Sequence, residues 1–212
     1  MECGIAWPKI QKALSYDLTC IDGCLLTHEH RDHSKSFYDV MKAGIDVYSS
    51  AGTFDFLDVK EKRRAISIES YVYYKVSKTF LAFPFNIIHD AKEPFGYIVH
   101  DKIDGDWLLF VPDSGFIKQR FNIKFSIIAI ECSYDMNILQ QRVDTQDINE
   151  SLAKRLLASH AEKQTTMRYL DEFCDLSNCL EIHLLHMSAG NIDKQETKKE
   201  FEQRFFIETI IK

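Results

Sequence analysis

The sequence has few of the residues that divide a chain into separate parts. Its 212 residues include only 4 prolines and 8 glycines, and no Pro-, Gly- or Ser-rich linker, repeat or low-complexity tract interrupts it. No stretch approaches the roughly 20 uninterrupted apolar residues of a membrane helix. No basic segment followed by an apolar one opens the chain, as a secretory signal would require. These absences predict a single domain over residues 1–212, in a soluble cytoplasmic protein with no membrane partner.

The cysteines and the charge exclude further classes. The 6 cysteines show neither the density of a disulfide scaffold nor the Cys-x-x-Cys spacing of a zinc finger, so we interpret them as free thiols in a reducing compartment. A formal net charge of -6 argues against a nucleic-acid binder driven by overall charge, although it leaves room for a local basic groove. An apolar content of 45% is enough to form a substantial core.

The densest chemistry in the chain lies at residues 28 to 33, which read His-Glu-His-Arg-Asp-His. Three imidazoles and a carboxylate provide the nitrogen and oxygen ligands that zinc and similar divalent ions prefer. The short apolar segment 24–27, which predicts a buried strand, precedes this run. The ligands would therefore project from a loop at the end of a strand, where α/β folds usually build their sites.

Apolar runs and helical patterns alternate along the rest of the chain, and the middle third is almost entirely strand-like. The turn sequence at 101–106 predicts a hairpin in which Gly105 takes a positive φ. Runs such as 125–130 show little polar alternation, which is typical of sheets covered on both faces. The pattern predicts an α/β (α+β) fold, a four-layer αββα sandwich in which helices cover two sheets.

Three more metal-binding residue types follow apolar runs. His89 follows the run 85–88, Asp113 follows 108–111, and His186 follows 184–185. A single histidine at the end of a strand is more often structural than a ligand, but several in order after a four-ligand loop favour a metal site. His100 and His183 lie within strand patterns, and we interpret them as structural.

This ordered set resembles the metallo-β-lactamase-fold hydrolases over nearly the whole chain. The family motif His-x-His-x-Asp-His matches residues 28 to 33, and the later motifs place a histidine, an aspartate and a histidine in the order seen here. The resemblance implies two groups of metal ligands joined by one bridge: His28, His30 and His89 for one ion, Asp32, His33 and His186 for the second, and Asp113 between them. The ions would be zinc, with manganese or iron as alternatives, and would share a hydroxide nucleophile. Asp32 could also accept a proton in catalysis.

Between Asp113 and His186 the sequence is similar to a bacterial exonuclease branch of the fold, a relative of the ribonuclease Z group. Glu131 to Asp135, then Arg155 to His160, then residues 184 to 188 resemble three motifs of that branch. The match departs at Tyr134, where histidine is expected, and after His160. The resemblance makes Arg155, His160 and Ser188 candidate substrate contacts, with His160 also a candidate proton donor to a phosphate leaving group. A surface histidine at a helix end is the competing interpretation of His160.

The function predicted is a dinuclear metal-dependent phosphodiesterase acting on nucleic acid or a nucleotide. Two alternatives stay open: a hydrolase of a thioester, lactone or amide, and a catalytically inactive, metal-stabilised binding protein. In the fold, a strand ending in an acidic residue and glycine, here Glu2 to Gly4, follows about two earlier strands. Either those N-terminal strands are missing from this sequence or the sheet is reduced. A reduced sheet would expose strand edges that a homo-oligomer could cover.

Overall fold

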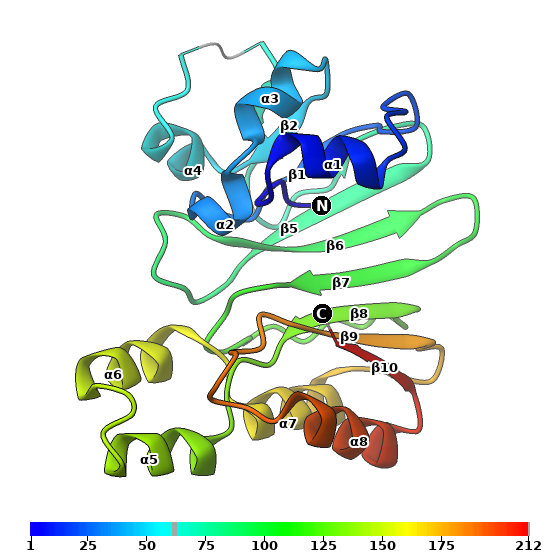
Figure 1. Cartoon of the computed structure of the whole chain (residues 1–212). Coiled ribbons are helices and arrows are strands. Elements are labelled where there is room, and N and C mark those ends of the chain that lie inside the picture. The colour runs from blue at the N-terminus through cyan, green and yellow to red at the C-terminus, as the bar shows by residue number, and fades with distance from the viewer. Residues whose placement is uncertain (61–62, 212) are drawn as a thin grey trace. The chain divides into compact units, whose positions relative to one another are not determined.

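The structure is a computed structural model that describes residues 1–60 and 63–211 (Figure 1). The chain forms two compact units: Met1–Asn86 with Asp90–Tyr97, and Ile87–His89 with the chain from Ile98 onwards. The backbone therefore passes from one unit to the other after Asn86, after His89 and after Tyr97. Each unit has a cluster of buried apolar side chains of its own.

The first unit contains a small parallel sheet. Strands β1 (Cys24–Leu25), β2 (Val47–Ser49) and β3 (Ala65–Ser67) pair in that order, with Cys24 opposite Val47 and Val47 opposite Ala65. β1 and β2 are buried throughout, as their continuous apolar pattern predicts. The helices of this unit are α1 (Trp7–Ala13), α2 (Arg31–Ser34), α3 (Phe37–Lys42) and α4 (Ala51–Phe56).

Strands β4 (Tyr74–Lys75) and β5 (Phe80–Asn86) form an antiparallel pair in the first unit, with Tyr74 opposite Ala82. The sequence pattern predicts two strands, at 79–82 and 85–88, separated near Pro84. The structure has one strand there. β4 pairs only as far as Ala82, so β5 tolerates Pro84 beyond the paired segment, where the missing N–H removes no bond to β4.

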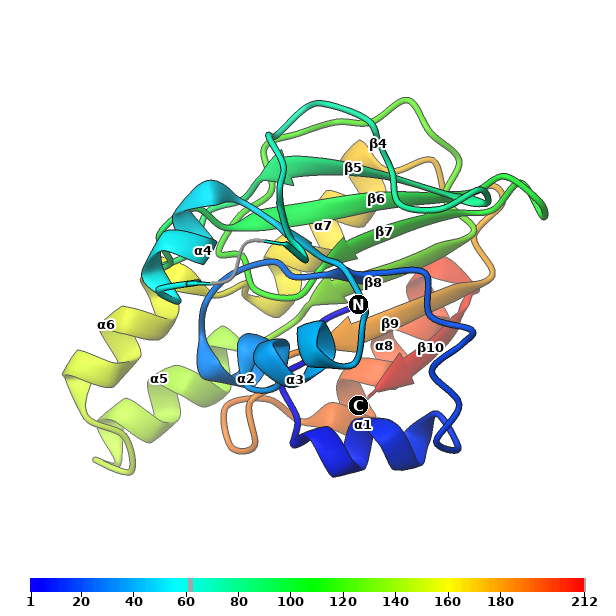
Figure 2. The same ribbon diagram turned by 90° about the horizontal axis from the view of Figure 1, so that it is seen from above.

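The second unit is built on parallel strands with helices against them. Strand β6 (Phe95–Asp101) enters it at Ile98, and β7 (Trp107–Val111), β8 (Ile127–Glu131), β9 (Glu181–Leu185) and β10 (Glu208–Ile211) follow in spatial order. The helices are α5 (Met136–Asp144), α6 (Glu150–Ser159), α7 (Lys163–Phe173) and α8 (Lys194–Phe205). α7 and α8 lie against one face of the strands β8 to β10 (Figures 1 and 2).

Short-range chemistry explains where these elements begin and turn. The side chains of Asp135, Asn149 and Asp193 accept hydrogen bonds from backbone N–H groups in the first turns of α5, α6 and α8. The predicted turn between β6 and β7 is present. Gly105 adopts φ 80°, and its N–H donates to the carbonyl of Asp101.

The alternating strands and helices confirm the predicted α/β class. Helices α2 and α4 are absent from the sequence prediction. α2 has only 4 residues and no apolar one, and the 6 residues of α4 include Gly52, which is unfavourable inside a helix. Among residues 1–60 and 63–211, no helix combines the length and the apolar character needed to cross a bilayer.

Candidate metal-ligand clusters

The histidine run lies directly after β1, as the sequence predicts. His28 is fully buried, His30 is the residue that precedes α2, and His33 lies within α2. The ring centroids of His30 and His33 lie 4.7 and 4.2 Å from that of His28. The first unit therefore gathers three imidazoles at one point, with the Asp32 carboxylate 3.6 Å from the Nε2 atom of His33.

Two residues outside the ring cluster hold these imidazoles in place. Thr27 Oγ1 lies 2.9 Å from His28 Nδ1, and Glu2 Oε2 lies 3.3 Å from His33 Nδ1. The other oxygen of Glu2 accepts a hydrogen bond from the N–H of Thr27. Both rings thus have a partner at Nδ1, so a metal ion would be bound through Nε2. A carboxylate behind a histidine ligand fixes the orientation of the ring and raises its basicity.

The loop at residues 28 to 33 is anchored by Glu29, which lies between two of its histidines, and by the N-terminal segment. Glu29, to which the sequence assigns no chemistry, is buried, and its Oε1 accepts from the N–H of Lys92 at 2.7 Å. Ser34 Oγ donates to the carbonyl of Glu29. A Cβ atom on Gly4 would lie 1.4 Å from the carbonyl oxygen of Asp32, so only glycine permits this close approach.

A second cluster forms within the second unit from the residues that follow its strands. Ligand atoms of His89, Asp113 and His160 lie within 4.8 Å of one another, and so do those of Glu131, His160 and His186. Asp113 Oδ2 is 3.5 Å from His89 Nε2 and 3.8 Å from His186 Nε2. The Asp113 side chain is 3% exposed, so its charge needs partners of opposite sign.

Glu131, at the end of β8, organises this cluster. Its Oε1 lies 2.6 Å from His160 Nδ1 and 3.0 Å from His186 Nδ1. Its Oε2 accepts hydrogen bonds from the N–H groups of Ser114 and Ala161. A carboxylate that is 1% exposed and holds four such contacts fixes both imidazoles. Glu131 lies within one of the motifs of the resemblance, but the sequence alone predicts no role for it.

Hydrogen bonds also define which ring nitrogen carries the proton at two positions. His89 Nδ1 lies 3.1 Å from the carbonyl oxygen of Ser159, which can only accept, so Nδ1 carries the proton and Nε2 keeps its lone pair. A carboxylate imposes the same choice on His160. His186 has φ 52°, a left-handed conformation that costs free energy in a residue other than glycine. Such strain is typical of functional positions.

Arg155 and Ser188, which the sequence makes candidate substrate contacts, are not among the clustered ligand residues. Arg155 is exposed on α6. Ser188 is half-buried, and its Oγ accepts from the side-chain amide of Asn191. His100 stacks on Trp107 at a centroid distance of 4.0 Å, and His183 pairs with Glu181, as expected for structural histidines.

Tyr134 and His160 have different roles in the structure. Burial, with the charges of Glu162 and Glu131, raises the pKa of Tyr134 to about 12, so this side chain is a neutral core residue packed with Leu139. His160, in contrast, is 9% exposed and belongs to both ligand groups of the second unit. The interpretation of His160 as a surface histidine is therefore wrong, because its ring turns inward to Glu131 rather than toward solvent.

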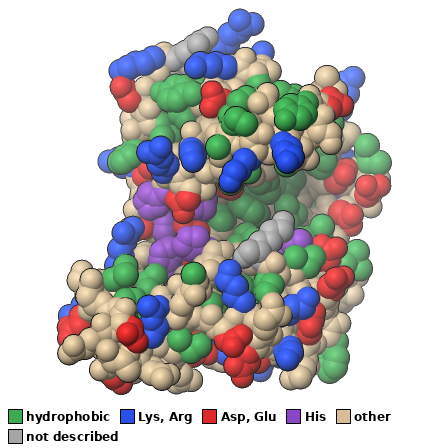
Figure 3. Space-filling view, viewed as in Figure 1, with side chains coloured by type: hydrophobic (Ala, Val, Ile, Leu, Met, Phe, Trp, Pro, Cys, Tyr) green, Lys and Arg blue, Asp and Glu red, His purple; other side chains and the backbone are tan. Residues whose placement is uncertain are grey.

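The donor sets fit divalent ions. Neutral imidazole nitrogens and carboxylate oxygens are the ligands of zinc, manganese and iron sites, and both clusters present them on rings that hydrogen bonds orient. Histidine side chains reach the surface in the face shown in Figure 3, so solvent has access to them. These clusters are compatible with metal binding.

Comparison with solved structures identifies the fold. A metallo-β-lactamase fold protein, YhfI from Bacillus subtilis, matches with a TM-score of 0.73 and 17% identity, over 100% of this chain and 82% of that one. Zn²⁺-bound PqqB from Methylobacterium extorquens matches with a TM-score of 0.66 and 11% identity, over 98% and 79%. A metal-dependent hydrolase from Parabacteroides distasonis matches with a TM-score of 0.62 and 14% identity, over 90% and 76%.

The chain therefore has the metallo-β-lactamase fold, and its structural neighbours include metal-dependent hydrolases. No family model matches the sequence, and no curated protein sequence matches it either. At identities of 11 to 17%, these similarities establish the fold but not the substrate. The substrate has to be inferred from the residues of the site.

Proposed function

We propose that this protein is a metal-dependent hydrolase that cuts a phosphodiester bond in nucleic acid or a nucleotide. The single observation that carries the proposal is the buried Glu131–His160 pair beside Asp113 and His89. It combines a candidate metal position with an oriented imidazole in the second unit. The branch resemblance of the segments from Glu131 to Ser188 supports the phosphodiester as substrate.

The ligand assignment follows the order of the sequence motifs. We propose His28, His30 and His89 for one ion, Asp32, His33 and His186 for another, and Asp113 as the bridge, with the two units acting as one domain. Zinc is the ion proposed, with manganese or iron as alternatives. When bound, the ions would activate water and stabilise the negative charge that develops on the phosphoryl oxygens.

The chain's own residues then supply the remaining chemistry. Glu131 accepts the Nδ1 proton of His160, which leaves Nε2 to hold or deliver a proton on the side of Asp113. An alkoxide leaves a phosphodiester readily only when it is protonated, whereas the thiolate of a thioester leaves without an acid. An oriented histidine is therefore more useful to a phosphodiesterase than to a thioesterase. Arg155 is the proposed second contact to the phosphate, although it lies exposed on α6.

The test is a substrate panel with metal-loaded protein. End-labelled DNA and RNA, cyclic nucleotides and bis-p-nitrophenyl phosphate represent phosphodiesters, while nitrocefin, a lactone and a thioester represent the alternatives. We expect turnover of a phosphodiester that is lost in Asp113→Asn and retained in the matched control His183→Gln. Turnover of the second group alone would contradict the proposal, as would metal binding with no turnover of any substrate.

A leaving-group comparison separates the role of His160 from that of a metal ligand. A proton donor should matter greatly for an alkoxide and little for p-nitrophenolate, which leaves without help. We expect His160→Gln to lower turnover of a nucleic-acid substrate by about 10² to 10⁴-fold while turnover of bis-p-nitrophenyl phosphate falls far less. Equal losses on both substrates, with loss of bound metal, would assign His160 to the ligands instead.

A further inference from the structure

The first unit contains a cavity of about 460 Å³ beneath helix α1. The cavity is partly open to solvent. Sites for small molecules occupy roughly 300 to 1,000 Å³. The cavity therefore has the size of a ligand site.

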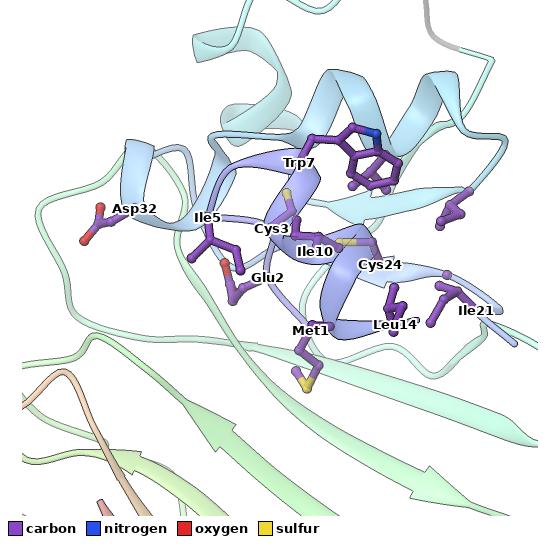
Figure 4. A pocket seen from close by; sticks show the side chains of 15 residues that line it. Met1, Glu2, Cys3, Ile5, Trp7, Ile10, Leu14, Ile21, Cys24 and Asp32 are labelled. Atoms are coloured by element: carbon purple, nitrogen blue, oxygen red, sulfur yellow. The ribbon is translucent and has the colours of Figure 1, made fainter. Parts of the chain in front are cut away.

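The walls of this cavity are apolar and rich in polarisable groups. Figure 4 shows Cys3, Ile10 and Cys24 near the indole of Trp7, and Met1 also lines the cavity. Trp7 and Ile10 pack against the buried cluster to which Cys3 and Cys24 belong. Among the described lining residues none is Lys, Arg or His, and the charged side chains there are the carboxylates of Glu2 and Asp32. An anion would therefore lie beside like charge, whereas an aromatic ring would find an indole and thiol sulfurs.

Helix α1 covers the cavity without being buried itself. Trp7, Ile10 and Leu14 recur at helical spacing and line the cavity, yet α1 contains no fully buried residue. A helix with an apolar stripe normally buries it. The apolar stripe of α1 is thus incompletely covered by protein. Just after the helix, Ser15 and Tyr16 have positive φ values, of 52° and 61° respectively.

We propose that this cavity binds an uncharged aromatic group of a small molecule. The occupant would stack on or edge against Trp7 and complete the burial of the α1 stripe. The cavity also has a direct link to the histidine run, because Glu2 lines it and contacts both Thr27 N–H and His33 Nδ1. Occupancy would therefore be felt at the proposed metal ligand His33. Binding itself depends on neither metal nor turnover, so it is independent of the proposed function.

The chain provides its own reporter for the test. It has two tryptophans, Trp7 and Trp107, and Trp107 belongs to the second unit, where it stacks on His100. In the Trp107→Phe protein, all tryptophan emission comes from Trp7. Titration of this metal-free protein with N-phenyl-1-naphthylamine, an uncharged aromatic probe, should give saturable binding of one probe per chain, with energy transfer from Trp7.

Two substitutions on α1 form a matched pair. Ala13 lines the cavity and Lys12 does not, so Ala13→Phe should fill the space and weaken probe binding by about tenfold or more, while Lys12→Phe leaves it unchanged. Circular dichroism checks that both variants fold, and Leu14→Phe is a second filling variant if Ala13→Phe does not. Equal binding by filled and control variants would overturn the proposal, and so would a folded protein that binds no probe.

A second copy of the chain is the competing occupant. If sedimentation showed a dimer whose dissociation shifted Trp7 emission, and the probe failed to bind the dimer, the cavity would be an interface and the proposal would be overturned. Saturable probe binding to a monomer, at a ratio unaffected by protein concentration, would support it. A panel of uncharged aromatic compounds of increasing size would then measure how much of the 460 Å³ the occupant fills.

Discussion

Glu131 Oε1 lies 2.6 Å from His160 Nδ1 and 3.0 Å from His186 Nδ1, so one buried carboxylate oxygen orients two imidazoles. The same side chain accepts two backbone hydrogen bonds through its other oxygen. A group with this many partners cannot be exchanged for its amide without leaving some of them unsatisfied.

Glu131→Gln should therefore weaken both metal binding and stability. The amide nitrogen cannot accept from Ser114 or from a histidine, so we expect the free energy of unfolding to fall by about 1 to 3 kcal/mol and metal affinity by about 10 to 100-fold. Urea unfolding of metal-free protein and competitive zinc titration measure the two effects. Glu181→Gln is the control, since Glu181 pairs with His183. Unchanged metal affinity in Glu131→Gln would show that the carboxylate does not support His186 as a metal ligand.

Lys163, whose side chain is buried, pairs with the half-buried carboxylates of Asp135 and Glu200 at 2.7 and 2.8 Å. We expect Lys163→Met to lower the free energy of unfolding by about 3 kcal/mol, because two carboxylates lose their common cation. The exposed pair Lys154–Glu150 serves as a control, and Lys154→Met should cost less than about 1 kcal/mol. Similar losses in the two variants would contradict the assigned importance of burial.

The ion pair of Asp135 with Lys163 should make the free energy of unfolding depend on pH. Burial would raise the pKa of Asp135, but hydrogen bonds from Lys163 and from the backbone hold the pKa below its ordinary value. The unfolded state then binds this proton more readily than the native state. The contribution of Asp135 to stability is present above its ordinary pKa of about 3.9 and is lost as the pH falls through the lower native value. Urea unfolding between pH 7 and pH 3 should show this loss in the native protein and a smaller one in Asp135→Asn.

Gly4→Ala should disturb the histidine run from a distance. A methyl group there meets the carbonyl of Asp32 at 1.4 Å, so the N-terminal segment or the loop must move. We expect a loss of more than about 1 kcal/mol in the free energy of unfolding, together with weaker metal binding. Gly105→Ala is the contrast: it meets no atom within 4 Å, but φ 80° costs about 1 kcal/mol and should leave metal binding intact. Equal metal affinities in the two variants would refute the link.

The six free cysteines should react in a defined order. Cys20 is exposed, whereas burial raises the pKa of Cys132 far above its ordinary value and raises those of Cys174 to about 12 and Cys179 to about 11. Because the thiolate is the reactive form, Cys20 should be alkylated first at neutral pH, and Cys179 should gain reactivity as the solution becomes alkaline. Mass mapping after timed iodoacetamide treatment measures the order. Early labelling of Cys132 would show that the second unit opens locally.

Much of the candidate site could be predicted from the sequence because its ligands follow strands. His89, Asp113 and His186 stand one to three residues after β5, β7 and β9, and apolar runs of this kind are the strongest local signal in the chain. The role of Glu131 could not be predicted this way. An acidic residue at the end of β8 looks like any polar turn, and its partners lie 29 and 55 residues later.

The burial of His160 was equally hidden in the sequence. Its position at the end of α6 is typical of a surface cation, and only the return of the chain toward Glu131 turns the ring inward. The cavity under α1 has no sequence signature either. Trp7, Ile10 and Leu14 predict an apolar stripe, but not that space remains beneath it.

The backbone passes between the two units after Asn86, His89 and Tyr97, and this limits how the chain can be cut into fragments that fold. His89 belongs to the second unit, yet it is synthesised before Asp90–Tyr97, the last segment of the first unit. No single proteolytic cut can release either unit whole, and a fragment ending at Asn86 would lack the Lys92 N–H that anchors Glu29. Coexpressed fragments split within the turn at 101–106 should reassemble better than fragments split at either side of His89, because that turn lies outside all three crossings.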